Sequence, residues 1–176
     1  MATLTDIRHS LLRARDTFEQ RPSSALHDDS VAVAMWKGGL ATDLMHPTLA
    51  GLRTDMPSVL GGEEGGPSPG WFFRAGLASC MATSIAMEAS LRGIVLTRLE
   101  VHAHSETDAR GMLGAAGVPA GALRFWLDIV LEAQDAPDAA LRELVSAADA
   151  HSPMSSAIRR PVDVAIGLRL PAGGAE

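Results

Sequence analysis

Cysteine is almost absent from this sequence. Among its 176 residues Cys80 is the only one, so no disulfide can form within the chain. Such scarcity is typical of proteins from reducing compartments. The N-terminus also shows no positively charged start followed by an apolar stretch, so we expect no secretion signal and a cytoplasmic location.

Basic clusters, internal repeats and phosphate-binding glycine motifs are also missing. The formal net charge is -6, and lysine and arginine are nowhere gathered with interleaved aromatic residues. Nucleic acid is therefore not an expected partner. The length suits a single domain over residues 1–176, with a helical arm over 1–22 and a frayed tail over 171–176.

What is present is a long run with few charges, residues 69–92. Ser68 is a good N-cap, Pro69 suits the first helical position, and Gly93 is a typical C-terminal stop. A helix that is apolar on nearly all sides must be buried on nearly all sides. The run is long enough to span a membrane, but its internal charges and frequent serine and threonine argue against that reading. We predict a central core helix that carries Cys80.

Short alternating segments surround this run. Alternation of apolar and polar residues is typical of antiparallel strands with one wet face. Strands are predicted over residues 31–36, 40–45, 48–53, 97–104, 122–132 and 162–170, with further helices over 4–19 and after Pro137. This order predicts an α+β fold with antiparallel sheets around the long helix. One covering sheet leaves the other side of the helix bare, so we expect a homodimer with the core helices at or near the shared interior.

Cys80 is the only evident nucleophile. A cysteine in the middle of a helix gains little from the helix dipole, so its reactivity requires a positive charge from elsewhere in the chain or from a second subunit. Arg53, at the end of a predicted strand, is our candidate for that charge. Arg74 is predicted to lie on the opposite side of the helix from the sulfur. The alternative is a structural core cysteine.

His151, Ser152 and Pro153 interrupt the later helical pattern. Ser152 and Pro153 are fully explained as the N-cap and the first position of a short helix. His151 is also a candidate base near Cys80, although nothing in the spacing requires that role.

Two further pairs of titratable residues lie outside these helices. Glu63 and Glu64, in the glycine-rich loop before the long helix, are either solvated charges or auxiliary groups of the site. His102 and His104 share one face of a predicted strand, two residues apart, which is compatible with metal ligation. No other ligand cluster is apparent, so we expect surface histidines, no metal and no other cofactor.

The order and spacing of these motifs resemble the OsmC/Ohr family, named after osmotically inducible protein C and the organic hydroperoxide resistance proteins. The resemblance runs from about Val31 to Leu170. It includes PSPGWFFRAGLASC, the helix ending at RGI, the strand LEVHAH, the segment ALRELVSAADAHSP and the last alternating strand. It implies an intertwined α+β homodimer with two active sites at the subunit interface. Active members are cysteine-based peroxidases that reduce organic hydroperoxides.

The functional residues implied by this resemblance carry over only in part. The reactive cysteine of the family matches Cys80. Its second cysteine matches Ser152, and its glutamate, which follows the proline at the head of the central helix, matches Gly70. The family's arginine comes from the N-terminal strands, where Arg53 is the candidate. A sulfenic acid formed on Cys80 would therefore need an external thiol for its reduction.

Three hypotheses about function remain. The first is a one-cysteine peroxidase that reduces small organic hydroperoxides with an external thiol reductant. The second is a dimer that is not a peroxidase and binds a small hydrophobic ligand in an apolar cleft beside Cys80. The third is a stress-related protein in which Cys80 is only structural. Reaction of the reduced protein with a hydroperoxide separates the first hypothesis from the others.

Overall fold

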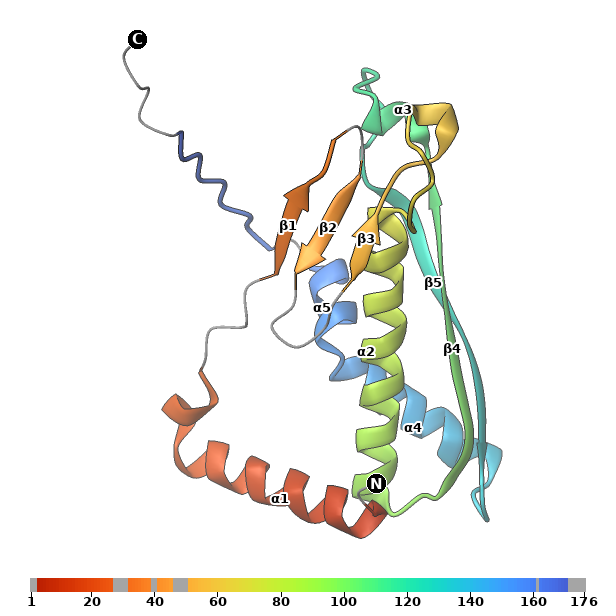
Figure 1. Cartoon of the computed structure of the whole chain (residues 1–176). Coiled ribbons are helices and arrows are strands. Elements are labelled where there is room, and N and C mark those ends of the chain that lie inside the picture. The colour runs from red at the N-terminus through yellow and green to blue at the C-terminus, as the bar shows by residue number, and fades with distance from the viewer. Residues whose placement is uncertain (1–2, 27–31, 39–40, 46–50, 161, 171–176) are drawn as a thin grey trace.

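The computed structural model describes residues 3–26, 32–38, 41–45, 51–160 and 162–170. The elements are α1 (Leu4–Gln20), β1 (Val33–Trp36), β2 (Thr42–Met45), β3 (Leu52–Thr54), α2 (Pro69–Arg92), β4 (Leu96–Thr107), α3 (Ala109–Met112), β5 (Ala122–Ala133), α4 (Asp138–Ala150) and α5 (Pro153–Arg159). Figure 1 shows α2 in the middle of the molecule, with β1–β3 near its N-terminal end and the long β4–β5 pair along one side. The predicted α+β arrangement around a long helix is confirmed.

Helix α2 begins and ends where the sequence predicts. The Ser68 hydroxyl accepts a hydrogen bond from the Trp71 N–H at 3.2 Å, and Gly93 ends the helix in the left-handed region at φ 71°. The core residues of α2 and α4 pack against one another and against the inner face of the β4–β5 sheet. These buried core residues are Met81, Ile85, Ala89, Leu144 and Ala148. None of the helices in the described part of the chain is long and apolar enough to cross a membrane.

Both sheets are antiparallel, as predicted. Strands β1, β2 and β3 pair in that order, and β4 pairs with β5. Strand β4 is longer than the predicted 97–104, because its pairing with β5 continues to Thr107. Strand β3 covers Leu52–Thr54, whereas the sequence predicted a strand over 48–53. Residues 48–50 of that prediction, and residues 31 and 40 of the two preceding predicted strands, lie outside the described residues.

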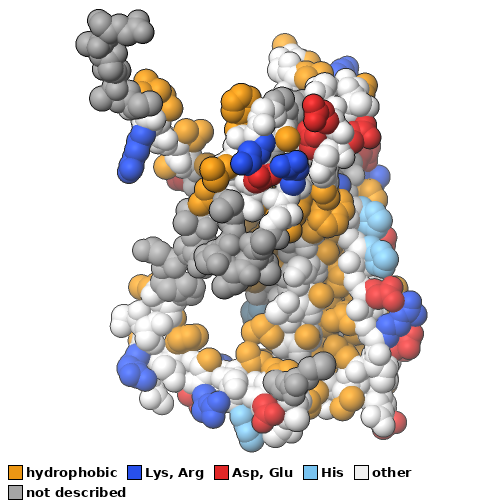
Figure 2. Space-filling model, viewed as in Figure 1, with side chains coloured by type: hydrophobic (Ala, Val, Ile, Leu, Met, Phe, Trp, Pro, Cys, Tyr) orange, Lys and Arg blue, Asp and Glu red, His pale blue; other side chains and the backbone are white. Residues whose placement is uncertain are grey.

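The strand predicted over residues 162–170 is wrong for the single chain. These residues pair with no strand within the described ranges and leave the body as the projecting segment seen at the upper left of Figure 1. Their apolar side chains are exposed, and Figure 2 shows them in orange along this projection. Alternation predicts which face of a strand is apolar, but a strand forms only where another strand takes up its N–H and C=O groups.

The N-terminal helix lies across the other end of α2. Its N-cap Thr3 and Asp6 form a capping box, and α1 ends at Gln20, shortly before Pro22. Helix α1 contacts α2, and Figure 1 shows it crossing near the C-terminal end of that helix. The predicted helix over 4–19 is confirmed, and it contains no fully buried residue.

A buried carboxylate organises the loop between β3 and α2. Asp55 is 2% exposed, and it accepts hydrogen bonds from the backbone N–H groups of Met56 at 2.7 Å, Gly65 at 3.0 Å and Glu63 at 3.1 Å. The loop also lies close to β3, since a Cβ at Gly66 would come within 2.5 Å of a β3 carbonyl oxygen. Asp55 therefore holds the loop that leads into α2.

Replacing Asp55 with asparagine is expected to destabilise the protein at neutral pH and to have less effect in acid. The N–H groups of Gly65 and then Met56 lower the pKa of the Asp55 carboxyl below its ordinary value of 3.8, although burial opposes them. A lowered folded-state pKa stabilises the fold above the unfolded value, and this stabilisation is lost as the pH falls through the lowered pKa. Urea unfolding at pH 7 and at about pH 3 measures the difference, with the exposed Asp16→Asn as control. A difference that is the same at both pH values would contradict this role of the ionised carboxylate.

Candidate functional site

The only sulfur nucleophile of the chain lies beside a buried hydroxyl. Cys80 is in the middle of α2 and is partly exposed. Its Sγ lies 3.5 Å from the Oγ of Ser152, a residue 72 positions away that is completely buried. The structure therefore brings together the position of the reactive cysteine and the position at which the family resemblance implies a second cysteine.

Ser152 owes its place to the junction between α4 and α5. Helix α4 ends at Ala150, with His151 as its C-cap, and Ser152 is the N-cap of α5, with its Oγ accepting a hydrogen bond from the Ser155 N–H at 3.4 Å. Pro153 follows as the first residue of α5. The structural role predicted for Ser152 and Pro153 is confirmed. The hydroxyl also contacts the sulfur, which the cap alone does not require.

Arg53 lies in β3 and is held by a neighbouring strand. Its Nε donates to the Asp43 carboxylate at 2.8 Å, and Asp43 is its register partner on β2. Lys37 lies 3.5 Å from the same carboxylate. Half of the Arg53 side chain is exposed. In the described part of a single chain, the hydrogen bonds of this guanidinium link it to Asp43 rather than to the sulfur of Cys80.

The first turns of α2 show what occupies the place of the family's glutamate. A Cβ on Gly70 would lie 3.8 Å from Nη1 of Arg74 and 3.9 Å from Oγ of Ser68, which are ordinary van der Waals contacts. Arg74 instead donates to Oγ of Ser105 on β4 at 3.2 Å. Since Cys80 contacts Ser152, next to α5, the two side chains leave α2 in different directions, as the helical spacing predicts.

The three auxiliary residues lie at different places. Glu64 accepts a hydrogen bond from the Ser58 N–H at 2.9 Å and has a positive φ of 57°, so it closes the loop held by Asp55. Glu63 contributes to the same loop through its backbone N–H, which donates a hydrogen bond to the Asp55 carboxylate. His151 is exposed at the end of α4, directly before Ser152.

An open groove with an apolar floor is lined by sequence neighbours of Cys80 and Ser152, although neither of these two residues itself lines it. It has a volume of about 670 Å³, and its floor includes Leu77 and Met81, which flank Cys80 on α2. Phe125, Leu127, Ile129, Val145 and Ile158 extend the apolar lining onto β5, α4 and α5. The charged residues that line the groove are Arg124, Arg142, Asp149 and Arg159. The apolar lining agrees with the cleft hypothesised from the sequence. The charged residues were not predicted, because they come from segments whose packing against α2 the sequence spacing does not reveal.

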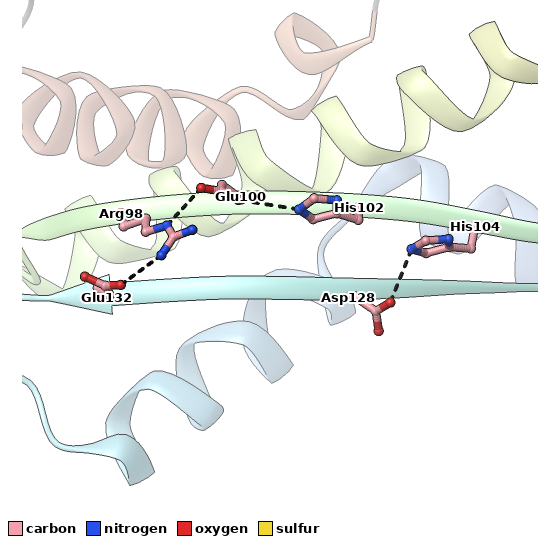
Figure 3. A network of polar contacts seen from close by, with 6 residues as sticks. All are labelled: Arg98, Glu100, His102, His104, Asp128 and Glu132. Carbon is pink, nitrogen blue, oxygen red and sulfur yellow. Dashed lines mark hydrogen bonds and ion pairs between the residues drawn. The ribbon is translucent and has the colours of Figure 1, made fainter.

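His102 and His104 lie on the outer face of the β4–β5 sheet. Figure 3 shows a network there in which His102 faces Glu100 at 3.5 Å and His104 faces Asp128 at 3.2 Å. The ring of His104 also stacks on Trp126, with centroids 5.0 Å apart. Among the residues described, no group of three His, Cys, Asp or Glu side chains is placed to hold a metal ion.

Comparison with known structures gives the class of the fold. An organic hydroperoxide resistance protein of Legionella pneumophila is 26% identical, with a TM-score of 0.54 over 78% of this chain and 95% of its own. An OsmC-like protein of Mycoplasma pneumoniae is 12% identical, with a TM-score of 0.65 over 76% and 89%. The organic hydroperoxide resistance protein OhrB of Bacillus subtilis is 23% identical, with a TM-score of 0.50 over 76% and 94%. These are α+β proteins of the OsmC-like fold.

The family follows from the sequence. The family model described as OsmC-like protein matches residues 61–167, which include all of α2, β4, β5, α4 and α5. The chain belongs to the OsmC family. No curated protein matches the sequence closely enough to count as a relative.

Proposed function

We propose that this chain is a stress-response protein that reduces organic hydroperoxides through Cys80, with an external thiol as reductant. The observation that carries the proposal is the position of Cys80, which is partly exposed on α2 between Leu77 and Met81, two residues that line a groove with an apolar floor. The name of the Legionella pneumophila protein, which denotes organic hydroperoxide resistance, supports this class of substrate.

The proposed reaction needs one sulfur and two external thiols. The Cys80 thiolate attacks the outer oxygen of ROOH, the O–O bond breaks, and RO⁻ takes up a proton to leave as ROH. Cys80 then carries a sulfenic acid. One external thiol condenses with it and releases water, and a second thiol cleaves the mixed disulfide to restore the Cys80 thiol. The external thiols end as a disulfide, so each cycle transfers two electrons from them to the hydroperoxide.

The chain itself offers a candidate for the positive charge that this thiolate requires. The Arg53 ion pair with Asp43 is half exposed, and an exposed pair of this kind is worth little. We propose that a second copy of the chain brings Arg53 and Cys80 together when the homodimer forms. The bare face of α2 supports a dimer, since Ser79, Thr83 and Met87 on it are exposed in the single chain.

Stoichiometric oxidation tests the proposed activity. The reduced protein is mixed with one equivalent of cumene hydroperoxide, the free thiol is counted, and sulfenic acid is trapped with dimedone. We expect the wild type to lose its thiol, to form the dimedone adduct in one sample, and to recover the thiol with excess dithiothreitol in a parallel sample without dimedone. Cys80→Ser should show none of these changes. A thiol that survives one equivalent of hydroperoxide would exclude the peroxidase.

The groove supports a second candidate function. A dimer that binds a small hydrophobic ligand beside a structural Cys80 would use the same apolar floor, which includes Leu77 and Met81. This function requires ligand binding that Cys80→Ser leaves unchanged. The peroxidase requires loss of turnover in the same variant, so one variant separates the two.

A further inference from the structure

The hydroxyl of Ser152 is buried against the only thiol of the chain. Ser152 is 0% exposed, and its Oγ lies 3.5 Å from the sulfur of Cys80. We infer that Ser152 is a positioning residue that donates its hydroxyl proton to the sulfur and so favours the thiolate. The inference rests on the proposed function only in that the thiolate is the species that reacts with a hydroperoxide.

The N-cap geometry determines which atom can donate. A serine hydroxyl has one proton to donate and two lone pairs that accept. The N–H of Ser155 can only donate, and its bond to Ser152 Oγ at 3.4 Å therefore uses a lone pair. The hydroxyl proton remains free for another acceptor. Because Ser152 is fully buried, bulk solvent does not reach its hydroxyl, and the acceptor that the described part of the chain places there is the sulfur of Cys80.

The hydrogen bond strengthens when Cys80 loses its proton. In the thiol form either Cys80 or Ser152 can be the donor, whereas a thiolate can only accept. Hydrogen bonds to an ionised acceptor are about twice as strong as those between neutral groups. The Ser152 hydroxyl therefore stabilises the thiolate more than the thiol and shifts the equilibrium toward the nucleophile.

Two ion pairs join charged side chains on the neighbouring helices. The titratable and charged side chains of residues 138–160 are Asp138, Arg142, Glu143, Asp149, His151, Arg159 and Arg160. Asp149 of α4 pairs with Arg159 of α5 at 2.9 Å, and Asp138 pairs with Arg142 at 3.4 Å. The electrostatic effects of the two opposite charges in each pair partly cancel at the distance of the sulfur. In the described part of the chain, the short contact of the Cys80 sulfur is the one with Ser152.

The rate of alkylation by iodoacetamide as a function of pH tests this inference on the full chain. At neutral pH the rate reports the fraction of thiolate, and on the alkaline plateau it reports access to the sulfur. Ser152→Ala is expected to slow alkylation at pH 7 by about three- to tenfold, with an unchanged plateau. Ser152→Gly removes the same hydroxyl but remains a good N-cap, so it separates the lost hydrogen bond from a lost cap. Ser152→Thr keeps a hydroxyl and should follow the wild type.

The matched control removes a buried hydroxyl of α2 that does not contact the sulfur of Cys80. Ser90 donates to the carbonyl oxygen of Ala86 at 2.8 Å, and Ser90→Ala should leave the alkylation curve unchanged. Alkylation curves of Ser152→Ala and Ser152→Gly that superimpose on the wild-type curve would overturn the inference. Curves in which the alkylation rate is lowered by the same factor at every pH, without a shift along the pH axis, would overturn it as well. No hydroperoxide is used, so a wild type that fails to react with cumene hydroperoxide would refute the peroxidase while leaving this result intact.

Discussion

Replacing Ser152 with cysteine is expected to let the chain close its own disulfide. The two side chains already lie within 3.5 Å at Sγ and Oγ, and small χ1 rotations can bring two sulfur atoms to the bonding distance of about 2.05 Å. When a hydroperoxide converts Cys80 to a sulfenic acid, the introduced thiol attacks it, and water leaves as the S–S bond forms. We expect complete loss of both thiols after one equivalent of cumene hydroperoxide, and full recovery with dithiothreitol.

Two comparisons isolate the effect of this substitution. Ser90→Cys places a second thiol on α2 away from the sulfur of Cys80, and it should keep one free thiol after the same treatment. Ser152→Cys combined with Cys80→Ser should form no intrachain disulfide. Non-reducing electrophoresis and the mass of the intact chain give the readout. If Ser152→Cys retains two free thiols after oxidation with diamide, the two positions do not approach in solution as they do in the structure.

A single charge on the projecting segment is expected to weaken the proposed homodimer by about 100-fold or more. Ile166 is 92% exposed in the single chain, and Val164 beside it is 83% exposed. Burying these side chains on a second copy would remove the exposed apolar stripe, and an unpaired carboxylate at such a position costs several kcal/mol. Ile166→Asp should therefore shift the protein from dimer to monomer in light scattering at micromolar concentration.

The control places the same charge one residue away. Ala165 lies on the other face of the alternating segment, and it is also exposed. Ala165→Asp is expected to leave the dimer intact, because the polar face of a strand tolerates a carboxylate. Equal mass distributions for Ile166→Asp and the wild type would show that this segment takes no part in the assembly.

Local signals were sufficient to predict most of the elements. Ser68, Pro69 and Gly93 act within a few residues of the ends of α2, so the sequence alone places both ends correctly. Alternation likewise predicts the two long strands, although β4 continues past the predicted end because its pairing with β5 continues. The segment 162–170 shows where this reasoning stops. Its pattern is as clear as that of β5, but no strand among the described residues of the single chain pairs with it.

The candidate site depended on contacts between distant residues. Cys80 and Ser152 are 72 residues apart, and only the resemblance to the OsmC/Ohr family pointed to a relation between them. The role of Asp55 could not be predicted, because its N–H donors include Glu63 and Gly65, eight and ten residues further along the chain. The partner of Arg53 follows from the register of β2 and β3, which the sequence does not reveal.

The hydroxyl beside Cys80 also has a consequence for kinetics. A neighbouring thiol would make reduction of the sulfenic acid a first-order event with a fixed ceiling. With Ser152 in that place, return to the thiol becomes a bimolecular encounter, whose speed rises in proportion to the concentration of the reductant. Under a pulse of hydroperoxide, the surviving fraction of active molecules would then depend on how fast small thiols arrive before a second oxidant does.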